Sequence, residues 1–142
     1  MYKRQILDVR HQKDFVKGFI PGSWFIGIDG GFAPWVGSLI KDINQKIVIV
    51  CPEGREEEVV TRLARVGYDN AVGYLKESFL SWEKTGRKID TIIQETAEEL
   101  EEKNKNGINI LDVRKATEYN IEHIESAQNK PCLLYTSPSP RD

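Results

Sequence analysis

Apolar residues occur in short runs separated by polar stretches, and their spacing alternates between that of a strand and that of a helix. The run KIVIV at Lys46–Val50 is bounded by polar residues and predicts a strand buried on both faces of a parallel sheet. From residue 55 or 56 to about residue 66 the apolar positions follow helical spacing. Gly67 is a natural stop for that helix.

Shorter elements are predicted on either side of this central strand and helix. Ile6–Val9 has the pattern of a strand, and it is followed by a helix of about two turns that buries Phe15. The segment GGFAPWVG, residues 30–37, is typical of a structured loop or a broken helix. Strands alternating with helices at these lengths predict an α/β fold, a parallel sheet flanked by helices on both faces. The remaining predicted elements are a strand at Ala71–Leu75, a helix at Ser78–Lys84, and a Glu-rich amphipathic helix at Thr91–Asn104 with the apolar stripe Ile92, Ile93, Ala97 and Leu100.

The pentapeptide ILDVR occurs twice, at Ile6–Arg10 and at Ile110–Arg114. With this offset Phe15 aligns with Tyr119, and the subsequent residues align without a gap. The repeat therefore predicts two copies of one α/β unit, the second cut short. The predicted organisation is a domain at residues 6–89, with the option that an N-terminal strand is missing, a linker helix at 90–106, and the truncated start of a second domain at 107–131.

Both ends of the chain are foreign to this pattern. If Tyr2–Gln5 is written TAT AAG AGA CAG, the reverse complement encodes Cys, Leu, Leu and the start of Tyr, which are Cys132–Tyr135. The tail CLLYTSPSPRD resembles translated read-through of a transposase-type sequencing adapter. We therefore predict that residues 1–5 and 132–142 are adapter translation. The alternative is an ordinary polar tail rich in Ser and Pro.

Charge and length narrow the classes of partner. The chain has 20 basic and 22 acidic side chains; without Lys3, Arg4, Arg141 and Asp142 these become 17 and 21, a formal charge of −4. An acidic domain without a basic stripe is not expected to bind nucleic acid, where affinity comes mainly from Lys and Arg. No apolar run approaches the roughly 20 residues that span a bilayer, so no membrane partner is expected.

Cys51 is the only thiol between residues 6 and 131. A single thiol excludes an internal disulfide within that segment and fits a reducing compartment, so we predict a cytoplasmic protein. The thiol stands between the predicted buried strand and a helix N-terminus, whose unpaired N–H groups and dipole favour a thiolate. Such a site can activate a cysteine or hold an anionic persulfide, and Gly54 would let the loop curl tightly.

Other chemistry-bearing residues are explained more simply by structure. Asp8 and Arg10 recur as Asp112 and Arg114 in the second copy, which lacks this loop, and we therefore interpret them as holding the fold. His11 and His123 do not occupy equivalent places in the repeat and have no companion ligands at metal-site spacing, so no metal is expected.

The ordered motifs resemble those of a rhodanese domain. LDVR followed by DFVKGFIPGS, a buried strand ending in Cys, then LARVGYDNAVGYL and FLSWEKTG carry the resemblance. It implies that Cys51 accepts a sulfane sulfur as a persulfide and passes it to a thiol, with a small sulfur-containing donor or thiol acceptor as partner and no cofactor in this segment. The implied substrate-binding loop is formed by Glu53, Gly54, Arg55, Glu56 and Glu57.

The segment GREEEVVTRLARVGYDN also resembles rhodanese modules fused behind a metallo-β-lactamase-fold hydrolase of the persulfide dioxygenase type. That resemblance implies an upstream hydrolase domain as a further partner. The loop departs from the pattern of active members because Pro52 removes an N–H donor and Glu53, Glu56 and Glu57 bring negative charge.

The sequence leaves three functions open. The first is a sulfurtransferase that carries a persulfide on Cys51, and the second is a catalytically inactive structural or regulatory module of the fused hydrolase. The third is anion sensing or phosphate-ester chemistry; phosphatases need an Arg at the fifth position after the Cys, where this chain has Glu56. Whether the chain is an enzyme is therefore undecided at this level.

Overall fold

The computed structural model describes residues 4–131. The predicted adapter tail and residues 1–3 of the predicted adapter start lie outside the described residues, whereas Gln5 is the first residue of a strand. The chain divides into two compact units, one up to Ile93 and one from Gln94. No helix within residues 4–131 is long and apolar enough to cross a membrane.

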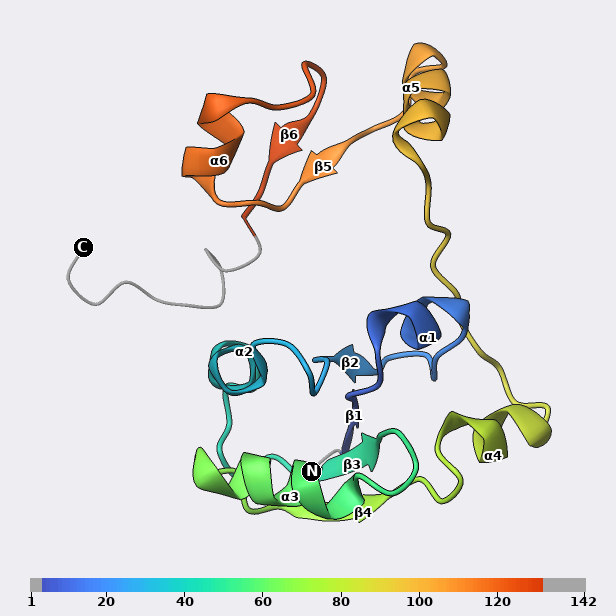
Figure 1. Cartoon of the computed structure of the whole chain (residues 1–142), viewed down its shortest axis with the longest axis vertical. Helices are drawn as coiled ribbons and strands as arrows, with labels where there is room; N and C mark the ends of the chain where they lie inside the picture. The colour runs from blue at the N-terminus through green and yellow to red at the C-terminus, as the bar shows by residue number, and fades with distance from the viewer. Residues whose placement is uncertain (1–3, 132–142) are drawn as a thin grey trace. The chain divides into compact units, whose positions relative to one another are not determined.

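The first unit contains a parallel four-stranded sheet in the order β2-β1-β3-β4 (Figure 1). Strands β1 and β3 are the interior strands of this sheet, and helices pack on both of its faces. The predicted class, an α/β fold with a parallel sheet flanked by helices, is confirmed. The strands are β1 Gln5–Asp8, β2 Trp24–Phe25, β3 Ile47–Val50 and β4 Ala71–Tyr74, and the helices are α1 Gln12–Lys17, α2 Phe32–Leu39, α3 Glu56–Arg65 and α4 Phe79–Lys84.

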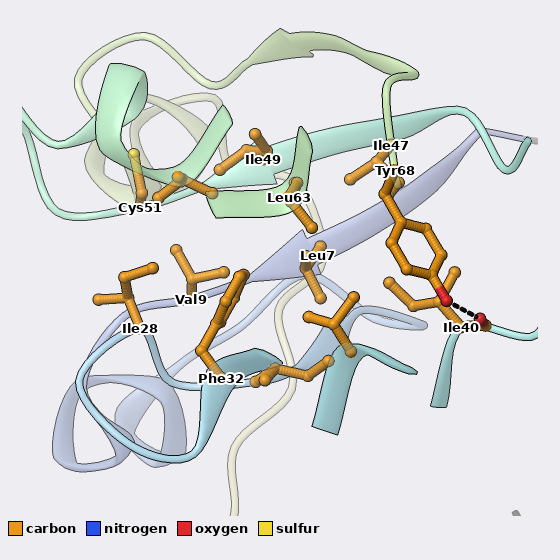
Figure 2. Close-up of a cluster of buried hydrophobic side chains, with 13 residues drawn as sticks. Leu7, Val9, Ile28, Phe32, Ile40, Ile47, Ile49, Cys51, Leu63 and Tyr68 are labelled. Carbon is orange, nitrogen blue, oxygen red and sulfur yellow. Dashed lines mark hydrogen bonds between the residues drawn. The ribbon is translucent and has the colours of Figure 1, made fainter. Parts of the chain in front are cut away.

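Helices α2 and α3 cover one face of this sheet. Side chains alternate along a strand, so Leu7 and Val9 of the β1 segment and Ile47 and Ile49 of β3 point to the same face, where each is fully buried. Phe32 and Val36 from α2 and Val59 and Leu63 from α3 pack against them, and Figure 2 shows part of this cluster. This face is the larger of the two cores.

A smaller core lies on the opposite face. It contains Ile20, Val50 and Phe79, the last from α4. On the same side Phe15 of α1 stacks on Phe19 and packs against Phe25, with ring centroids 4.3 and 4.5 Å apart. Helices therefore cover both faces.

Two helices differ from the sequence expectation. Residues 32–39 form a regular helix, α2, where a loop or broken helix was expected; Pro34 is tolerated because it lies in the first turn, where its missing N–H has no helical partner. The predicted helix from Thr91 begins only at Ala97, because Thr96 and Glu99 form a capping box there. Ile92 and Ile93, assigned to its apolar stripe, precede this helix and are exposed.

The second unit repeats the beginning of the first. It contains α5 Ala97–Lys105, β5 Leu111–Asp112, α6 Ala116–Ile121 and β6 Gln128–Asn129. The register of β5 on β6 pairs Leu111 with Gln128, which corresponds to Leu7 with Trp24 in the first unit. The sequence repeat is therefore also a structural repeat of strand, helix and parallel strand.

A buried ion pair joins three parts of the first unit. Nε of Arg10 donates to Oδ1 of Asp8 over 3.0 Å and Nη2 to Oδ2 over 2.8 Å, and the two side chains are 9% and 1% exposed. Nη2 also donates to the carbonyl of Gly18 over 2.8 Å. The guanidinium lies 4.6 Å from the ring centroid of Phe79. The pair therefore connects β1, the α1–β2 connection and α4.

Replacing Arg10 by Ala should lower the free energy of unfolding of the first unit by about 3–5 kcal/mol, because it leaves the Asp8 carboxylate buried without its partner. Denaturant unfolding followed by tryptophan fluorescence measures this, since all three Trp residues lie before Ile93. Arg65→Ala on the exposed side of α3 is the matched control and should change the value by less than about 0.5 kcal/mol. Equal effects of the two variants would contradict the structural role of the pair.

Candidate functional site

The candidate site is the loop between β3 and α3. It begins at Cys51, and the N–H of Arg55 donates to the carbonyl of Pro52 over 3.1 Å, which closes a tight turn. Gly54 inside this turn has φ +88°, a conformation that glycine adopts without strain. Helix α3 follows with an acidic first turn, Glu56–Glu58, and no side-chain cap. The N–H groups of this turn have no partner inside the helix.

The Cys51 thiol belongs to the apolar core. Its residue is 3% exposed, and it is part of the same cluster as Val9, Ile28 and Phe32 (Figure 2). No hydrogen bond to its sulfur occurs among residues 4–131. The thiol therefore lacks the amide donors that would stabilise a thiolate or persulfide anion.

Burial raises the pKa of the Cys51 thiol to about 11. The Glu56 carboxylate raises this pKa further, Arg55 opposes it, and Asp8 adds to the rise. A thiol in an unfolded chain has a pKa of about 8.5. The folded state consequently retains a proton that the unfolded state loses, so the contribution of this thiol to stability declines as the pH rises from about 8.5 to about 11.

Arg55, the one cation in the predicted loop, is engaged elsewhere. Its Nη1 and Nη2 donate to the two carboxylate oxygens of Asp29 over 3.0 Å each. Its Nε and Nη2 donate to Glu58 over 2.9 Å each. These bonds hold the pKa values of Asp29 and Glu58 below their ordinary values. Both hydrogen-bonding edges of the guanidinium are therefore occupied by carboxylates.

A cleft of about 430 Å³ lies beside the loop, and Cys51 is not among the residues that line it. Pro52 and Glu53 form the part of its wall that belongs to the loop. A larger cleft of about 570 Å³, lined by His11 and Trp35 among others, also leaves Cys51 out. Among the charged residues that line the smaller cleft, acidic side chains outnumber basic ones: Asp14, Glu53, Glu77 and Glu83 lie beside Lys17 and the paired Arg10.

The predicted site residues thus lie on one loop and one helical turn, but they do not converge on the sulfur. Glu53 and Glu57 are exposed, and Arg55 binds Asp29 and Glu58. Sequence reasoning missed Asp29, which has no local signal because it is 26 residues from Arg55. Among residues 4–131 no group of three His, Cys, Asp or Glu side chains is placed to hold a metal ion.

These features define a class: a parallel α/β domain with a lone cysteine between its central strand and the next helix. The profile of the rhodanese-like domain matches residues 1–85 and 95–141, so the chain belongs to the rhodanese-like domain family. A comparison with curated protein sequences gives no match.

Solved structures share this fold. The Rhodanese_3-like domain of the Alr3790 protein from Anabaena sp. is 20% identical with a TM-score of 0.59, over 67% of this chain and 99% of that chain. SseA from Escherichia coli, described as a 3-mercaptopyruvate sulfotransferase, is 18% identical with a TM-score of 0.50, over 92% of this chain and 69% of that chain. At these identities the similarity establishes the fold alone.

One turn beside the loop is strained. Glu77 and Ser78 have φ values of +59° and +54°, and Ser78 combines this with ψ −147°, a region populated almost only by glycine. Both residues line the 430 Å³ cleft. No pattern in the sequence marks this turn, because neither residue is glycine.

Ser78→Gly should therefore raise the free energy of unfolding of the first unit by about 1 kcal/mol, because it relieves a left-handed backbone conformation. Ser81→Gly is the matched control, since the same substitution inside α4 should lower the value by about 1 kcal/mol. Denaturant unfolding followed by tryptophan fluorescence gives both values. A loss of stability in both variants would show that the turn is not strained.

Ionisation of Cys51 tests the electrostatics of the loop. In a chain carrying Cys132→Ser, Cys51 is the only thiol, and the carbon-13 shift of its Cβ should show a pKa near 11. Glu56→Gln should lower this pKa, because the uncharged amide no longer opposes the thiolate. Glu57→Gln, the neighbouring exposed carboxylate, is the control and should shift the pKa less. A pKa below about 8.5, the ordinary thiol value, would contradict the buried site.

Proposed function

We propose that the first unit is a rhodanese-like module whose Cys51 carries no sulfur near neutral pH and which serves as a structural or regulatory part of a larger protein. The observation that carries this proposal is the position of the thiol inside the apolar core, with a pKa of about 11. Attack on sulfane sulfur needs a thiolate. At pH 7 a thiol with this pKa is ionised in only about one molecule in 10⁴.

Charge in the loop supports the same proposal. A thiosulfate-like donor is an anion, and the cleft beside the loop presents several carboxylates. The cations that line this cleft are Lys17 and Arg10, and Arg10 is already paired with Asp8. Arg55 does not compensate, because Asp29 and Glu58 bind its guanidinium. An anionic donor would therefore meet repulsion before it reached a sulfur that is covered.

The larger protein that we propose contains an upstream metallo-β-lactamase-fold hydrolase. This part of the proposal rests on the resemblance of residues 54–70, GREEEVVTRLARVGYDN, to rhodanese modules of that architecture. In the structure most of this segment is helix α3, whose buried side contributes Val59 and Leu63 to the core and whose other side is charged. We propose a cytoplasmic location for the whole protein.

Sulfur carriage by Cys51 is the second candidate, and one observation favours it. Cys51 follows β3 directly and precedes α3, whose first N–H groups have no helical partner. This position is the carboxyl end of a parallel strand, which is where ligands bind in such sheets. Carriage would require the loop to open toward solvent. A small sulfur donor and a thiol acceptor would then be its partners.

Mass spectrometry separates the two candidates. The Cys132→Ser chain is incubated near pH 7 with thiosulfate or with polysulfide, and the mass of the intact protein is measured before and after reduction. We expect no reducible sulfur on Cys51, because the thiol is protonated and covered. A sulfurtransferase treated in parallel shows that the donors are active, and Cys51→Ser in the same background defines the blank. A persulfide located on Cys51 would replace the first candidate by the second.

A further inference from the structure

A short glycine-rich segment lies between β2 and α2. Its sequence is GIDGG, residues 27–31, and three of its five residues are glycine. Glycine lowers the stability of a folded segment because it loses the most conformational freedom on folding. None of the three has a positive φ, and a Cβ added at any of them would lie at least 3.5 Å from its nearest contact. Neither the backbone conformation nor close packing therefore requires glycine in this segment.

The apolar side chain of this segment is buried beside the cysteine. Ile28 is 1% exposed and belongs to the cluster that contains Cys51. Figure 2 shows Ile28, Val9 and Cys51 at the same end of that cluster. The N–H of Ile28 donates to the carbonyl of Val9 over 3.0 Å, which ties the segment to the sheet. The four other residues of the segment line the 570 Å³ cleft, so the segment lies between this cleft and the core around Cys51.

Charged side chains of α3 and its N-cap hold the segment from the other side. Nη1 and Nη2 of Arg55 donate to the two carboxylate oxygens of Asp29 over 3.0 Å each. Nη1 of Arg62, one turn or more along the helix, donates to the carbonyl of Ile28 over 2.7 Å. The Glu58 carboxylate accepts from both guanidinium groups, over 2.9 Å from Arg55 and 3.5 Å from Arg62. Arg55, Glu58 and Arg62 therefore form one latch that grips two consecutive residues of the segment.

The forces on the segment favour a closed state that can open locally. The Arg55 and Asp29 side chains are 31% and 66% exposed, and an exposed ion pair shifts such an equilibrium by at most about fivefold. Burial of Ile28 favours the closed state, whereas the conformational freedom of three glycines favours the open one. Small residues at the ends of a segment with few buried side chains are typical of mobile lids.

We propose that residues 27–31 are a flap over the core around Cys51, that the latch holds this flap closed, and that its opening gives access to the thiol from the 570 Å³ cleft. The inference rests on the proposed function, because it names the device that keeps Cys51 from reacting in the module. The latch then determines how often the thiol can be reached, and the flap moves without the rest of the sheet.

Alkylation of Cys51 by iodoacetamide measures the opening of the flap. The reaction is followed by intact mass in the Cys132→Ser chain, in which Cys51 is the only thiol. Asp29→Asn should raise the rate about fivefold, because it removes the charge that Arg55 binds. Gly30→Ala should lower the rate about two- to fivefold, because alanine restricts the open segment. The added Cβ fits the closed flap, since its nearest contact would be at 3.8 Å.

Amide hydrogen exchange measured by NMR separates opening from ionisation of the thiol. Exchange at the N–H of Ile28 does not depend on the state of the sulfur, and in both variants it should change by the same factor as alkylation. In the unsubstituted flap this N–H should exchange faster than that of Val9, which is bonded to the carbonyl of Val50 inside the sheet and is released only by global unfolding.

Two matched controls lie outside the flap. Gly37→Ala makes the same substitution as Gly30→Ala but inside α2, where an added Cβ has no contact within 4 Å. It should slow exchange at Val9 about fivefold by stabilising the whole unit and leave alkylation of Cys51 unchanged. Asp69→Asn removes an exposed carboxylate beyond the end of α3 and should change none of these rates.

Two outcomes would overturn the flap. If Gly37→Ala slows alkylation as much as Gly30→Ala does, the thiol is reached only through global unfolding. If Asp29→Asn speeds alkylation without faster exchange at Ile28, the variant acts on ionisation of the thiol and not on opening. The proposed function fails by a different result: a persulfide on Cys51 after treatment with thiosulfate overturns it whatever the rates of these variants.

Discussion

The ion pair between Asp8 and Arg10 is the constraint on which the first unit depends. Two opposite charges removed from water are tolerable only when nearly every donor and acceptor is used, and here the carboxylate, the Gly18 carbonyl and the Phe79 ring surround the guanidinium. Because these partners come from three separate segments, the pair fixes where β1 ends and how α1 and α4 approach it. Its recurrence as Asp112 and Arg114 with the same hydrogen bonds argues for a role in the fold.

That structural pair also affects the chemistry of the neighbouring loop. Asp8 is one of the charges that raise the pKa of Cys51, although desolvation by the apolar core is the larger cause and Glu56 the next. The charge that opposes this rise is that of Arg55. Because Asp29 and Glu58 bind the guanidinium of Arg55, the electrostatics of the loop favour a neutral thiol.

The parts of the fold that the sequence predicts are those set by local pattern. The KIVIV run became β3, the apolar spacing after residue 55 became α3, and Gly67 ends that helix with φ +94°. Helix α2 was harder to predict because Pro and Gly suggest a break, and only the position of Pro34 in the first turn permits the helix.

The site was less predictable than the fold, because its properties arise between residues far apart in sequence. Whether the sulfur of Cys51 faces amides or the core depends on the packing of Ile28 and Phe32, and the orientation of Arg55 depends on Asp29, which belongs to the segment before α2. Neither relation leaves a periodic signal, so sequence reasoning could name the loop but could not assign its charge balance.

The two units separate local from tertiary contributions to the same motif. LDVR, its helix and its second strand take up the same hydrogen bonds in both, so these residues specify the motif without the rest of the sheet. Burial differs completely, since Leu7 is enclosed and Leu111 is open. The hydrophobic free energy of the motif is therefore realised only when a neighbouring strand and helices cover it. Local sequence determines the shape of this unit, and its stability comes from segments distant along the chain.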